Sequence, residues 1–314
     1  SFFILHSQFF ILHSSFFIHF MPQFPIFSKM KWFWSGTSGK TIAILMHEQD
    51  RNADRFQWAI SYLAEVWEED GHRVRYVFGV NKFVPADLAI LHVDLSVVPD
   101  EYIKFGRQYP VTLNGEIKDI RKSVISQNLV RPGDQYAGPV IIKSDLNYGG
   151  FPERRLAGKL AEASQTGIDS PMDYQILENL QAVPEAAWNS PDLVVEKFLP
   201  EMDGAFYCIR NYIFLGDQAN CTRRFSRRPI VNSQTQTRSE DIEPHPAIVG
   251  LRRKLGFDYG KFDYVIHNGQ PILLDANKTT GAATRSKKSP VQAHRRMRAR
   301  GLYEFFERRT NSAN

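Results

Sequence analysis

The chain has 314 residues, a formal net charge of +5 and two cysteines. Its apolar fraction of 43% and charged fraction of 23% are typical of a globular protein, and its length allows two or three packed units. Much of the excess positive charge follows Arg285 while the rest is near balance, which argues against a dedicated nucleic-acid binder. Cys208 and Cys221 are too few for a disulfide framework; they flank a predicted hairpin that allows them to face each other, and they would stay thiols in a reducing cytosol.

Residues 1–40 are unlike the rest of the chain. Three related segments, FFILHSQ, FFILHSS and FFIHF, carry polar residues in every repeat, so they do not supply the roughly 20 apolar residues of a spanning helix. They also lack the basic start and the small-residue cleavage site of a signal peptide. We interpret residues 1–40 as an N-terminal extension that is disordered or not native to the protein, with a membrane-associating segment as the alternative.

The segment SGTSGKT at residues 35–41 is not a P-loop. The pattern G-x-x-x-x-G-K-[ST] requires a glycine where this chain has Trp34, and a P-loop opens a helix, whereas an apolar strand follows here. We expect a loop that leads into the first strand.

An alternation of strands and helices begins at Thr41. It predicts strands at Ile42–Met46, Val74–Phe78 and Leu88–His92, with an amphipathic helix over Asp54–Glu69. Such alternation indicates a parallel sheet with helices on its faces, and ligands of such sheets bind beyond the carboxyl ends of the strands. The candidates for a substrate face at those ends are His47, Glu48, Asp94 and Asn114-Gly115.

A second unit follows a helix that is predicted from about Lys118 to Leu129. It begins with the segment PVIIKSDLNYGG, in which Val140–Lys143 has the composition of a buried strand. A lysine at the end of a strand can meet phosphate as a point charge, and the pair Gly149-Gly150 lets backbone N–H groups approach phosphate oxygens closely. Lys143, Gly149 and Gly150 are therefore candidate phosphate-binding residues.

The next elements are placed by apolar runs and turn residues. The predicted elements are a helix within Asp173–Ala182, a strand at Leu193–Val195, a hairpin of Ala205–Phe214 and Ala219–Phe225 around Leu215–Asp217, a loop over 226–245 and a helix at Ala247–Leu255.

The segment Gly260–Gly281, GKFDYVIHNGQPILLDANKTTG, predicts a hairpin that turns at Asn268-Gly269. Asp263 lies in its first strand and Asp275 ends the second, with Asn277 two residues later on the same side. The hairpin brings the two acids close together. Two carboxylates and one amide oxygen suit Mg²⁺, which completes its shell with phosphates and water.

This hairpin resembles the metal-binding end of the ATP-grasp superfamily, which includes D-alanine–D-alanine ligases, glutathione synthetases and glutamate-adding ligases. The resemblance implies that Asp263, Asp275 and Asn277 hold the Mg²⁺ ions that bridge the phosphates of ATP. Many relatives have an arginine two residues before the first acid. This chain has Lys261 there, which keeps the positive charge but lacks the planar guanidinium group that can make two parallel hydrogen bonds.

The resemblance extends over residues 140–281 and assigns further roles. The strand with Lys143 and the loop with Gly149 and Gly150 match the phosphate-binding parts of the family, and a second phosphate lysine is expected at Lys122, with Lys118 as the alternative. The segment Glu196, Lys197, Phe198 and Leu199 matches the hinge whose backbone pairs with adenine. Asp203, with Glu201 as the alternative, is the candidate acid for the ribose. Arg224 and Arg210 are the candidates that face the phosphates and the reacting carboxylate, with Arg223 adjoining.

These motifs together predict an α/β protein of the α+β ATP-grasp type. The expected parts are an N-terminal parallel α/β domain at 41–125, an ATP-grasp domain at 126–285 whose two α+β subdomains clasp ATP, and a basic, solvated C-terminal helix at 286–314. The implied function is that of a cytoplasmic, ATP-dependent carboxylate–amine ligase that acts through an acyl phosphate and uses Mg²⁺, with Mn²⁺ as an alternative ion. Its partners would be small-molecule or peptide carboxylate and amine substrates; we expect no nucleic-acid partner, and no membrane partner unless the N-terminal extension is native. The alternatives are a non-catalytic ATP-binding or regulatory module of the same fold and a nucleic-acid-binding protein that uses the basic tail.

Overall fold

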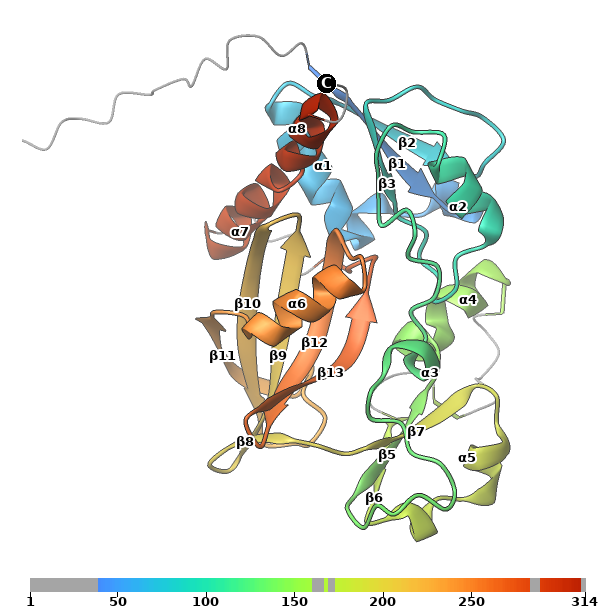
Figure 1. Cartoon of the computed structure of the whole chain (residues 1–314), viewed down its shortest axis with the longest axis vertical. Coiled ribbons are helices and arrows are strands. Elements are labelled where there is room, and N and C mark those ends of the chain that lie inside the picture. The colour runs from blue at the N-terminus through green and yellow to red at the C-terminus, as the bar shows by residue number, and fades with distance from the viewer. Residues whose placement is uncertain (1–38, 160–166, 169–172, 283–288, 312–314) are drawn as a thin grey trace, which may run out of the picture. The chain divides into compact units, whose positions relative to one another are not determined.

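The computed structural model describes residues 39–159, 167–168, 173–282 and 289–311 (Figure 1). The expectations for residues 1–38, and those for residues 286–288 and 312–314 of the tail, lie outside the described residues. The chain divides into Ser1–Ser38 and Gly39–Asn314, and the account below concerns the second unit. Within its described residues, every helix is too short or too polar to cross a lipid bilayer.

A parallel sheet with the strand order β2-β1-β3-β4 forms the N-terminal part of this unit (Figure 1). Alternate residues of β1 face opposite sides, so Ile42 and Ile44 pack with α1 while Ala43 and Leu45 pack with α2. The predicted parallel sheet with helices on both faces is confirmed. Its strands are β1 (Thr41–Met46), β2 (Arg73–Phe78), β3 (Leu88–Leu91) and β4 (Thr112–Leu113), and its helices are η1 (Glu48–Asn52), η2 (Arg55–Gln57), α1 (Ala59–Glu69) and α2 (Asp100–Gly106).

A small antiparallel sheet with the order β6-β5-β7 follows, and α5 covers one of its faces. Two predicted helices are wrong here. The helix expected to run to Leu129 is a single turn, α3, and the segment Asp173–Ala182 contains β6 and a short 3₁₀ turn, because pairing with β5 outweighs its local helix preference. The elements are α3 (Lys122–Ile125), β5 (Val140–Ser144), η3 (Asn147–Gly150), α4 (Phe151–Leu156), β6 (Gln175–Leu177), η5 (Leu180–Ala182), α5 (Glu185–Asn189) and β7 (Leu193–Lys197).

The largest sheet is antiparallel, with the order β11-β10-β9-β12-β13 and β8 paired with β9. Helix α6 lies over one face, where Ile248 packs with Phe262 and Tyr264 (Figure 1). The predicted hairpins are confirmed. The elements are β8 (Glu201–Asp203), β9 (Phe206–Leu215), β10 (Gln218–Ser226), β11 (Gln236–Ile242), α6 (Pro246–Lys254), β12 (Tyr259–His267) and β13 (Gln270–Asn277).

Two expectations about this sheet need correction. The region predicted as a loop contains β11, an edge strand that is exposed along almost its whole length and therefore has no apolar alternation to reveal it. Cys208 lies opposite Phe225, and Cys221 lies opposite Tyr212, so the two buried thiols do not face each other across the hairpin.

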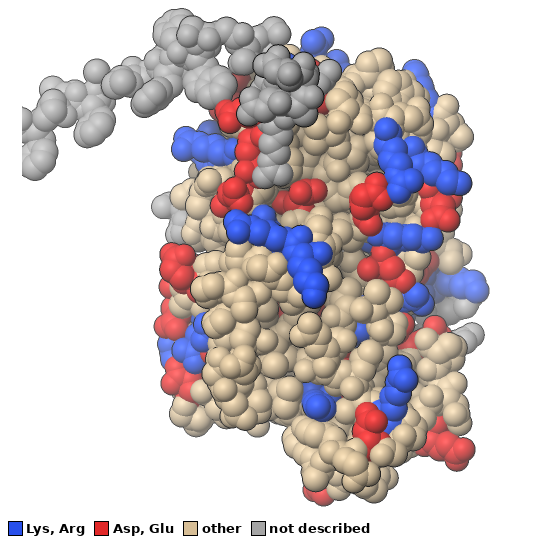
Figure 2. Space-filling model, in the orientation of Figure 1, with Lys and Arg blue, Asp and Glu red and all other residues tan. Residues whose placement is uncertain are grey.

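The C-terminal segment is packed rather than solvated. Helices α7 (Ser289–Arg300) and α8 (Tyr303–Asn311) lie beside α1, and Ala299, Leu302 and Phe305 enter the core of the first sheet (Figure 1). Trp67 donates a hydrogen bond from its ring nitrogen to the Ala299 carbonyl at 2.8 Å. Figure 2 shows basic side chains dispersed among acidic and uncharged ones on the face in view. The tail is therefore part of the folded unit and not a detached basic arm.

Candidate nucleotide and substrate site

The β12–β13 hairpin turns at Asn268 and Gly269, whose φ angles of 50° and 76° are those of a tight two-residue turn. The register that this turn starts places Asp263 directly opposite Asp275, across a bulge next to Asp263. Lys261 lies opposite Asn277 in the same register. The four side chains therefore share one face of the sheet, as the sequence predicted for the two acids and the asparagine.

These side chains are joined by two more from other elements. Lys261 Nζ lies 2.7 Å from Asp263 Oδ2, and Asn211 of β9 donates its amide N–H to the other Asp263 oxygen. Lys122 Nζ lies 3.6 Å from Asp275 Oδ1 and donates to a backbone carbonyl beside the glycine loop at 3.0 Å. We call Lys122, Asn211, Lys261, Asp263, Asp275 and Asn277 the hairpin cluster.

The environment of Asp275 suits a bound cation. Burial raises the pKa of its carboxyl, Lys122 opposes this effect, and the charge of Asp263 adds to it. Asp275 Oδ1 is buried without a hydrogen-bond partner among the described residues, which is costly unless a ligand completes its shell. The donor set of two carboxylates and the Asn277 amide oxygen fits Mg²⁺. No group of three His, Cys, Asp or Glu side chains forms a metal site in the described part of the chain, so the third protein ligand would have to be this amide.

Lys143 and Glu196 form a buried ion pair on the small sheet. Lys143 Nζ lies 2.5 Å from Glu196 Oε2, and the two side chains are only 8% and 1% exposed. They project from the face opposite the core that contains Ile142 and Val195. The charge of Lys143 lowers the pKa of Asp275, so this face looks toward the hairpin cluster.

The predicted glycine loop is a tight left-handed turn. Tyr148, Gly149 and Gly150 have φ angles of 49°, 63° and 71°, and Gly150 starts α4. A side chain at Gly150 would meet the flexible end of Leu146 at 3.0 Å, so it is chiefly the φ angle of 71° that favours glycine here. Because Lys122 binds the Leu146 carbonyl, the loop is tied to the hairpin cluster.

The predicted adenine hinge joins β7 to β8. The backbone N–H of Lys197 donates to Asn128 O and that of Phe198 donates to Pro139 O, both at 2.8 Å. Two of the N–H groups expected to meet adenine are therefore engaged within the protein. Leu199 follows them in the segment between the two strands.

Arg210 and Arg224 do not lie on the same side of the large sheet. Arg223 is directly opposite Arg210, whereas Arg224 is opposite Ile209. Ile209 and Asn211 share a face by strand alternation, and this is the face of the hairpin cluster. The structure therefore places Arg224 on the same face as the cluster and Arg210 on the α6 side.

Glu201 explains the position of Arg210. Its carboxylate, 5% exposed, pairs with Arg210 Nε at 2.9 Å and with Arg223 Nε at 2.8 Å, and accepts the Ile266 backbone N–H at 2.7 Å. Glu201 therefore holds β8, β9, β10 and β12 together rather than facing a ribose. Asp203, the preferred ribose acid, is more exposed and pairs with Arg223 at 3.2 Å.

The candidates for the substrate face separate into two groups. Asp94, just beyond β3, accepts hydrogen bonds from the Trp58 ring at 3.2 Å and from Thr279 Oγ1 at 2.5 Å, so it joins the first sheet to the end of β13. Asn114 instead donates its amide N–H to the Tyr259 carbonyl at 2.7 Å and is a structural bridge. His47 caps a 3₁₀ turn that contains Glu48.

Sequence reasoning missed several polar residues around Asp94. Arg155 of α4 lies 2.5 Å from buried Asp50 and 4.0 Å from Asp94. Lys278 is fully buried, and burial lowers its pKa to about 8. The sequence signal for Lys278 was its position directly after Asn277, but its burial depends on contacts between distant segments.

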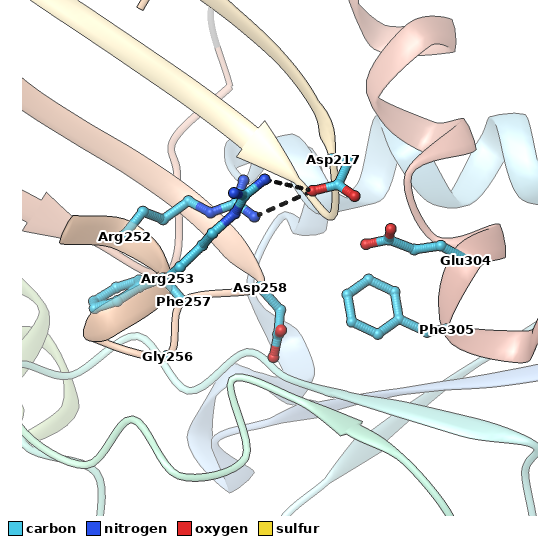
Figure 3. Close-up of a pocket in the computed structure, with 8 residues that line it drawn as sticks. All are labelled: Asp217, Arg252, Arg253, Gly256, Phe257, Asp258, Glu304 and Phe305. Atoms are coloured by element: carbon cyan, nitrogen blue, oxygen red, sulfur yellow. Dashed lines mark ion pairs between the residues drawn. The ribbon is translucent and has the colours of Figure 1, made fainter. Parts of the chain in front are cut away.

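A cavity of about 280 Å³ lies elsewhere, between the β9–β10 turn, α6 and α8 (Figure 3). Arg252 and Arg253 both point toward Asp217 on its wall, at 4.0 and 3.5 Å. None of the residues predicted for the nucleotide site lines it.

The comparisons with known proteins concern the fold. No protein-family profile and no curated protein matches the chain. The crystal structure of the D-alanine–D-alanine ligase from Bacillus anthracis complexed with ATP is 13% identical and aligns over 88% of this chain and 100% of that one, at a TM-score of 0.50. An ATP-grasp RimK-domain protein from Sphaerobacter thermophilus DSM 20745 is 15% identical over 85% of this chain and 98% of that one, at a TM-score of 0.47. The macrocyclase MdnB from Microcystis aeruginosa MRC is 10% identical over 85% and 99%, at 0.42.

Identities of this size bear on the fold alone. The likeness covers the whole of the D-alanine–D-alanine ligase chain, and the first sheet, the small sheet and the large sheet of this chain follow in the order that the motifs predicted. The chain has the fold of that D-alanine–D-alanine ligase.

Proposed function

We propose that this protein is an ATP-dependent ligase that joins a carboxylate to an amine through an acyl phosphate. The observation that carries the proposal is the hairpin cluster: Asp263 and Asp275 lie directly opposite each other, and Lys122 connects Asp275 to the glycine loop. Acids for a metal, lysines for phosphates and a glycine turn thus converge from separate elements. The likeness in fold to a D-alanine–D-alanine ligase complexed with ATP supports the proposal that the chain binds this nucleotide.

The proposed roles follow from the charges of these side chains. Asp263, Asp275 and Asn277 would hold Mg²⁺, which offsets the negative charge of the phosphates when it is bound. Lys122 and Lys143 would receive phosphate oxygens as point charges. Lys143 Nζ uses one of its three N–H donors for Glu196, which leaves donors for a phosphate oxygen.

Arg224 would supply a further positive charge for the proposed reaction. It lies on the cluster face of β10, where it would stabilise the negative charge on the transferred phosphoryl group. The substrate carboxylate attacks the terminal phosphorus of ATP and ADP leaves. The amine then attacks the acyl carbon, and inorganic phosphate leaves with its bonding electrons.

The test is ADP release from ATP and Mg²⁺ over a panel of amino acids and short peptides. We expect ADP release to rise severalfold with one carboxylate–amine pair, with a coupled product of matching mass. ATP binding without stimulated ADP release by any pair would favour the non-catalytic nucleotide-binding module instead. Absence of ATP binding would contradict both.

A further inference from the structure

Lys278 is a buried cation whose ammonium group makes no hydrogen bond within the described residues. Its side chain is fully buried, and its Nζ has no hydrogen-bond partner among them. An ammonium group taken out of water without a hydrogen bond is costly, so such groups are rarely retained in a core for stability alone. The position therefore suits an anionic ligand that accepts a hydrogen bond from Nζ, which none of the described residues does.

Three acids lie close enough for their charges to act on Lys278: Asp94, Asp119 and Glu153. Asp94 binds the Trp58 ring and Thr279, and Asp119 is paired with an arginine at 2.6 Å. One oxygen of Glu153 accepts a backbone N–H at 2.7 Å, while its other oxygen is buried without a hydrogen-bond partner among the described residues. Each acid therefore has a hydrogen bond or ion pair with a group other than Lys278.

A second cation with a spare donor lies beside the same acid. Arg155 binds Asp50 through one nitrogen, while its other terminal nitrogen is buried without a hydrogen bond and lies 4.0 Å from Asp94. Arg155 and Asp94 keep 18% and 17% of their side-chain surface exposed, so this group reaches solvent there. Lys278 and Arg155 thus provide two unsatisfied cationic donors around Asp94.

The surroundings separate this group from the proposed phosphate site. The charges that act on Asp275 are those of Lys122, Asp263, Lys261 and Lys143. Those that act on Lys278 come from acids of α4 and of the segments after β3 and β4. Lys278 therefore faces the first sheet, beyond the carboxyl ends of its strands, rather than the lysines that would meet ATP.

We propose that Lys278, together with Arg155, binds a carboxylate group of the substrate at the junction between the first sheet and the end of β13. The inference rests on the proposed ligase function for the identity of the anion. Lys278 directly follows Asn277, so a carboxylate held by its Nζ stands next to the proposed metal site. Lys278 would thus bind and position the substrate without taking part in bond making or breaking.

The test compares Lys278→Met with the matched control Lys254→Met, in which an exposed lysine of α6 is replaced in the same way. The melting temperature of the full chain is measured with acetate, glycine, glutamate or succinate, against chloride at equal ionic strength, with and without the ATP analogue AMP-PNP and Mg²⁺. We expect at least one carboxylate to raise the melting temperature of wild type and Lys254→Met in a saturable way. Lys278→Met should bind it roughly tenfold or more weakly, because a charge-assisted hydrogen bond is lost, and should keep the increment from AMP-PNP and Mg²⁺.

Equal carboxylate increments in all three proteins, or none in wild type, would overturn the proposal. A lower melting temperature of Lys278→Met with unchanged carboxylate increments would make Lys278 a structural residue and would overturn it too. If Lys278→Met does not fold, the ¹⁵Nζ resonance of Lys278 in wild type, assigned by its loss in Lys278→Arg, must move when the carboxylate is added; a stationary resonance refutes the proposal. If AMP-PNP and Mg²⁺ do not raise the melting temperature of wild type, the result counts against the proposed function instead. The comparison of the carboxylate increments can still be interpreted in that case.

Discussion

Lys143 and Glu196 form a buried ion pair, and in the proposed function Lys143 would also bind phosphate. Lys143→Met leaves the Glu196 carboxylate buried and unpaired, so we expect it to lower the free energy of unfolding by about 3–5 kcal/mol. Adding Glu196→Gln should recover most of this loss, because no charge then remains without a partner. Nucleotide affinity should stay low in both variants if Lys143 binds phosphate.

Urea unfolding and nucleotide titration of the single and double variants measure the two effects separately. Lys254→Met, at an exposed position of α6, is the control and should change neither. Full nucleotide affinity in a folded double variant would remove Lys143 from the site.

His92 is a second buried side chain whose polar atoms lack hydrogen bonds among the described residues. It is fully buried, both ring nitrogens are without a hydrogen bond in the described chain, and the Trp58 and Tyr259 rings lie next to it. Burial lowers its pKa to about 3, so the folded state keeps it neutral while the unfolded chain takes up a proton below about pH 6.5. Stability from this group is therefore complete above pH 6.5 and is lost as the pH falls toward 3.

His92→Phe removes this titration without removing a hydrogen bond. We expect wild type to lose stability relative to His92→Phe by about 1.4 kcal/mol per pH unit below pH 6.5. The measurement is urea unfolding of both proteins from pH 7 to pH 4. Parallel stability curves would show that His92 is protonated equally in the folded and unfolded states.

Part of the candidate site was predictable at this scale. The juxtaposition of Asp263 and Asp275 follows from an Asn-Gly turn and strand alternation, both of which are local. The roles of Asn211, Glu201 and Lys278 depend on partners more than fifty residues away or on burial by distant segments, and no local pattern signals them. Motif order along the chain does not determine such contacts.

At the scale of elements, turn length decides which side chains share a face. The β9–β10 turn has two residues, Gly216 and Asp217, with Leu215 paired directly to Gln218. The sequence suggested a turn of three residues. Because the length of the turn sets the register of the hairpin, the sequence alone did not determine whether Arg210 and Arg224 share a face. A one-residue change of register moves every side chain to the other face, which is why Arg210 binds Glu201 instead of joining Arg224.

Two glycines offer a matched test of how backbone conformation determines these elements. Gly269 has a φ of 76° in the hairpin turn, so Gly269→Ala should lower the free energy of unfolding by about 1 kcal/mol. Gly250 lies at an exposed position in α6 with open space around it, so Gly250→Ala should raise it by roughly 0.5–1 kcal/mol. Thermal and urea unfolding measure both. A loss of stability in Gly250→Ala, or none in Gly269→Ala, would contradict the described φ angles.

At the scale of the whole molecule, the order of the motifs predicted the fold, and the comparison with the ATP-complexed ligase supports it. The role of the C-terminal helices was not predictable, because a basic amphipathic segment looks alike whether it is solvated or packed. Its burial depends on Trp67 and the first sheet, more than two hundred residues earlier.

The two ends of the chain should therefore respond differently to truncation. Deleting residues 1–29 should leave folding and nucleotide binding intact, because the first sheet begins at Thr41. Deleting residues 289–314 should abolish soluble folding, because it removes Ala299, Leu302 and Phe305 from the core. Circular dichroism, thermal unfolding and ATP titration of the two truncated chains test this; equal behaviour would contradict the packing of α7 and α8.

The central claim is that the hairpin cluster binds Mg²⁺ for ATP chemistry. Asp275→Asn keeps the size of the side chain but removes a charge, so turnover should drop by orders of magnitude and partly recover as Mg²⁺ is raised. Asp100→Asn, which replaces an exposed acid paired with Lys118, is the matched control and should behave like wild type.

The most direct measurement is ADP release against Mg²⁺ concentration for wild type, Asp275→Asn and Asp100→Asn. The account predicts that the Asp275→Asn curve alone is shifted to higher Mg²⁺ and lowered. Superimposable curves for all three proteins would mean that the hairpin does not hold the metal, and the proposed ligase mechanism would then be wrong.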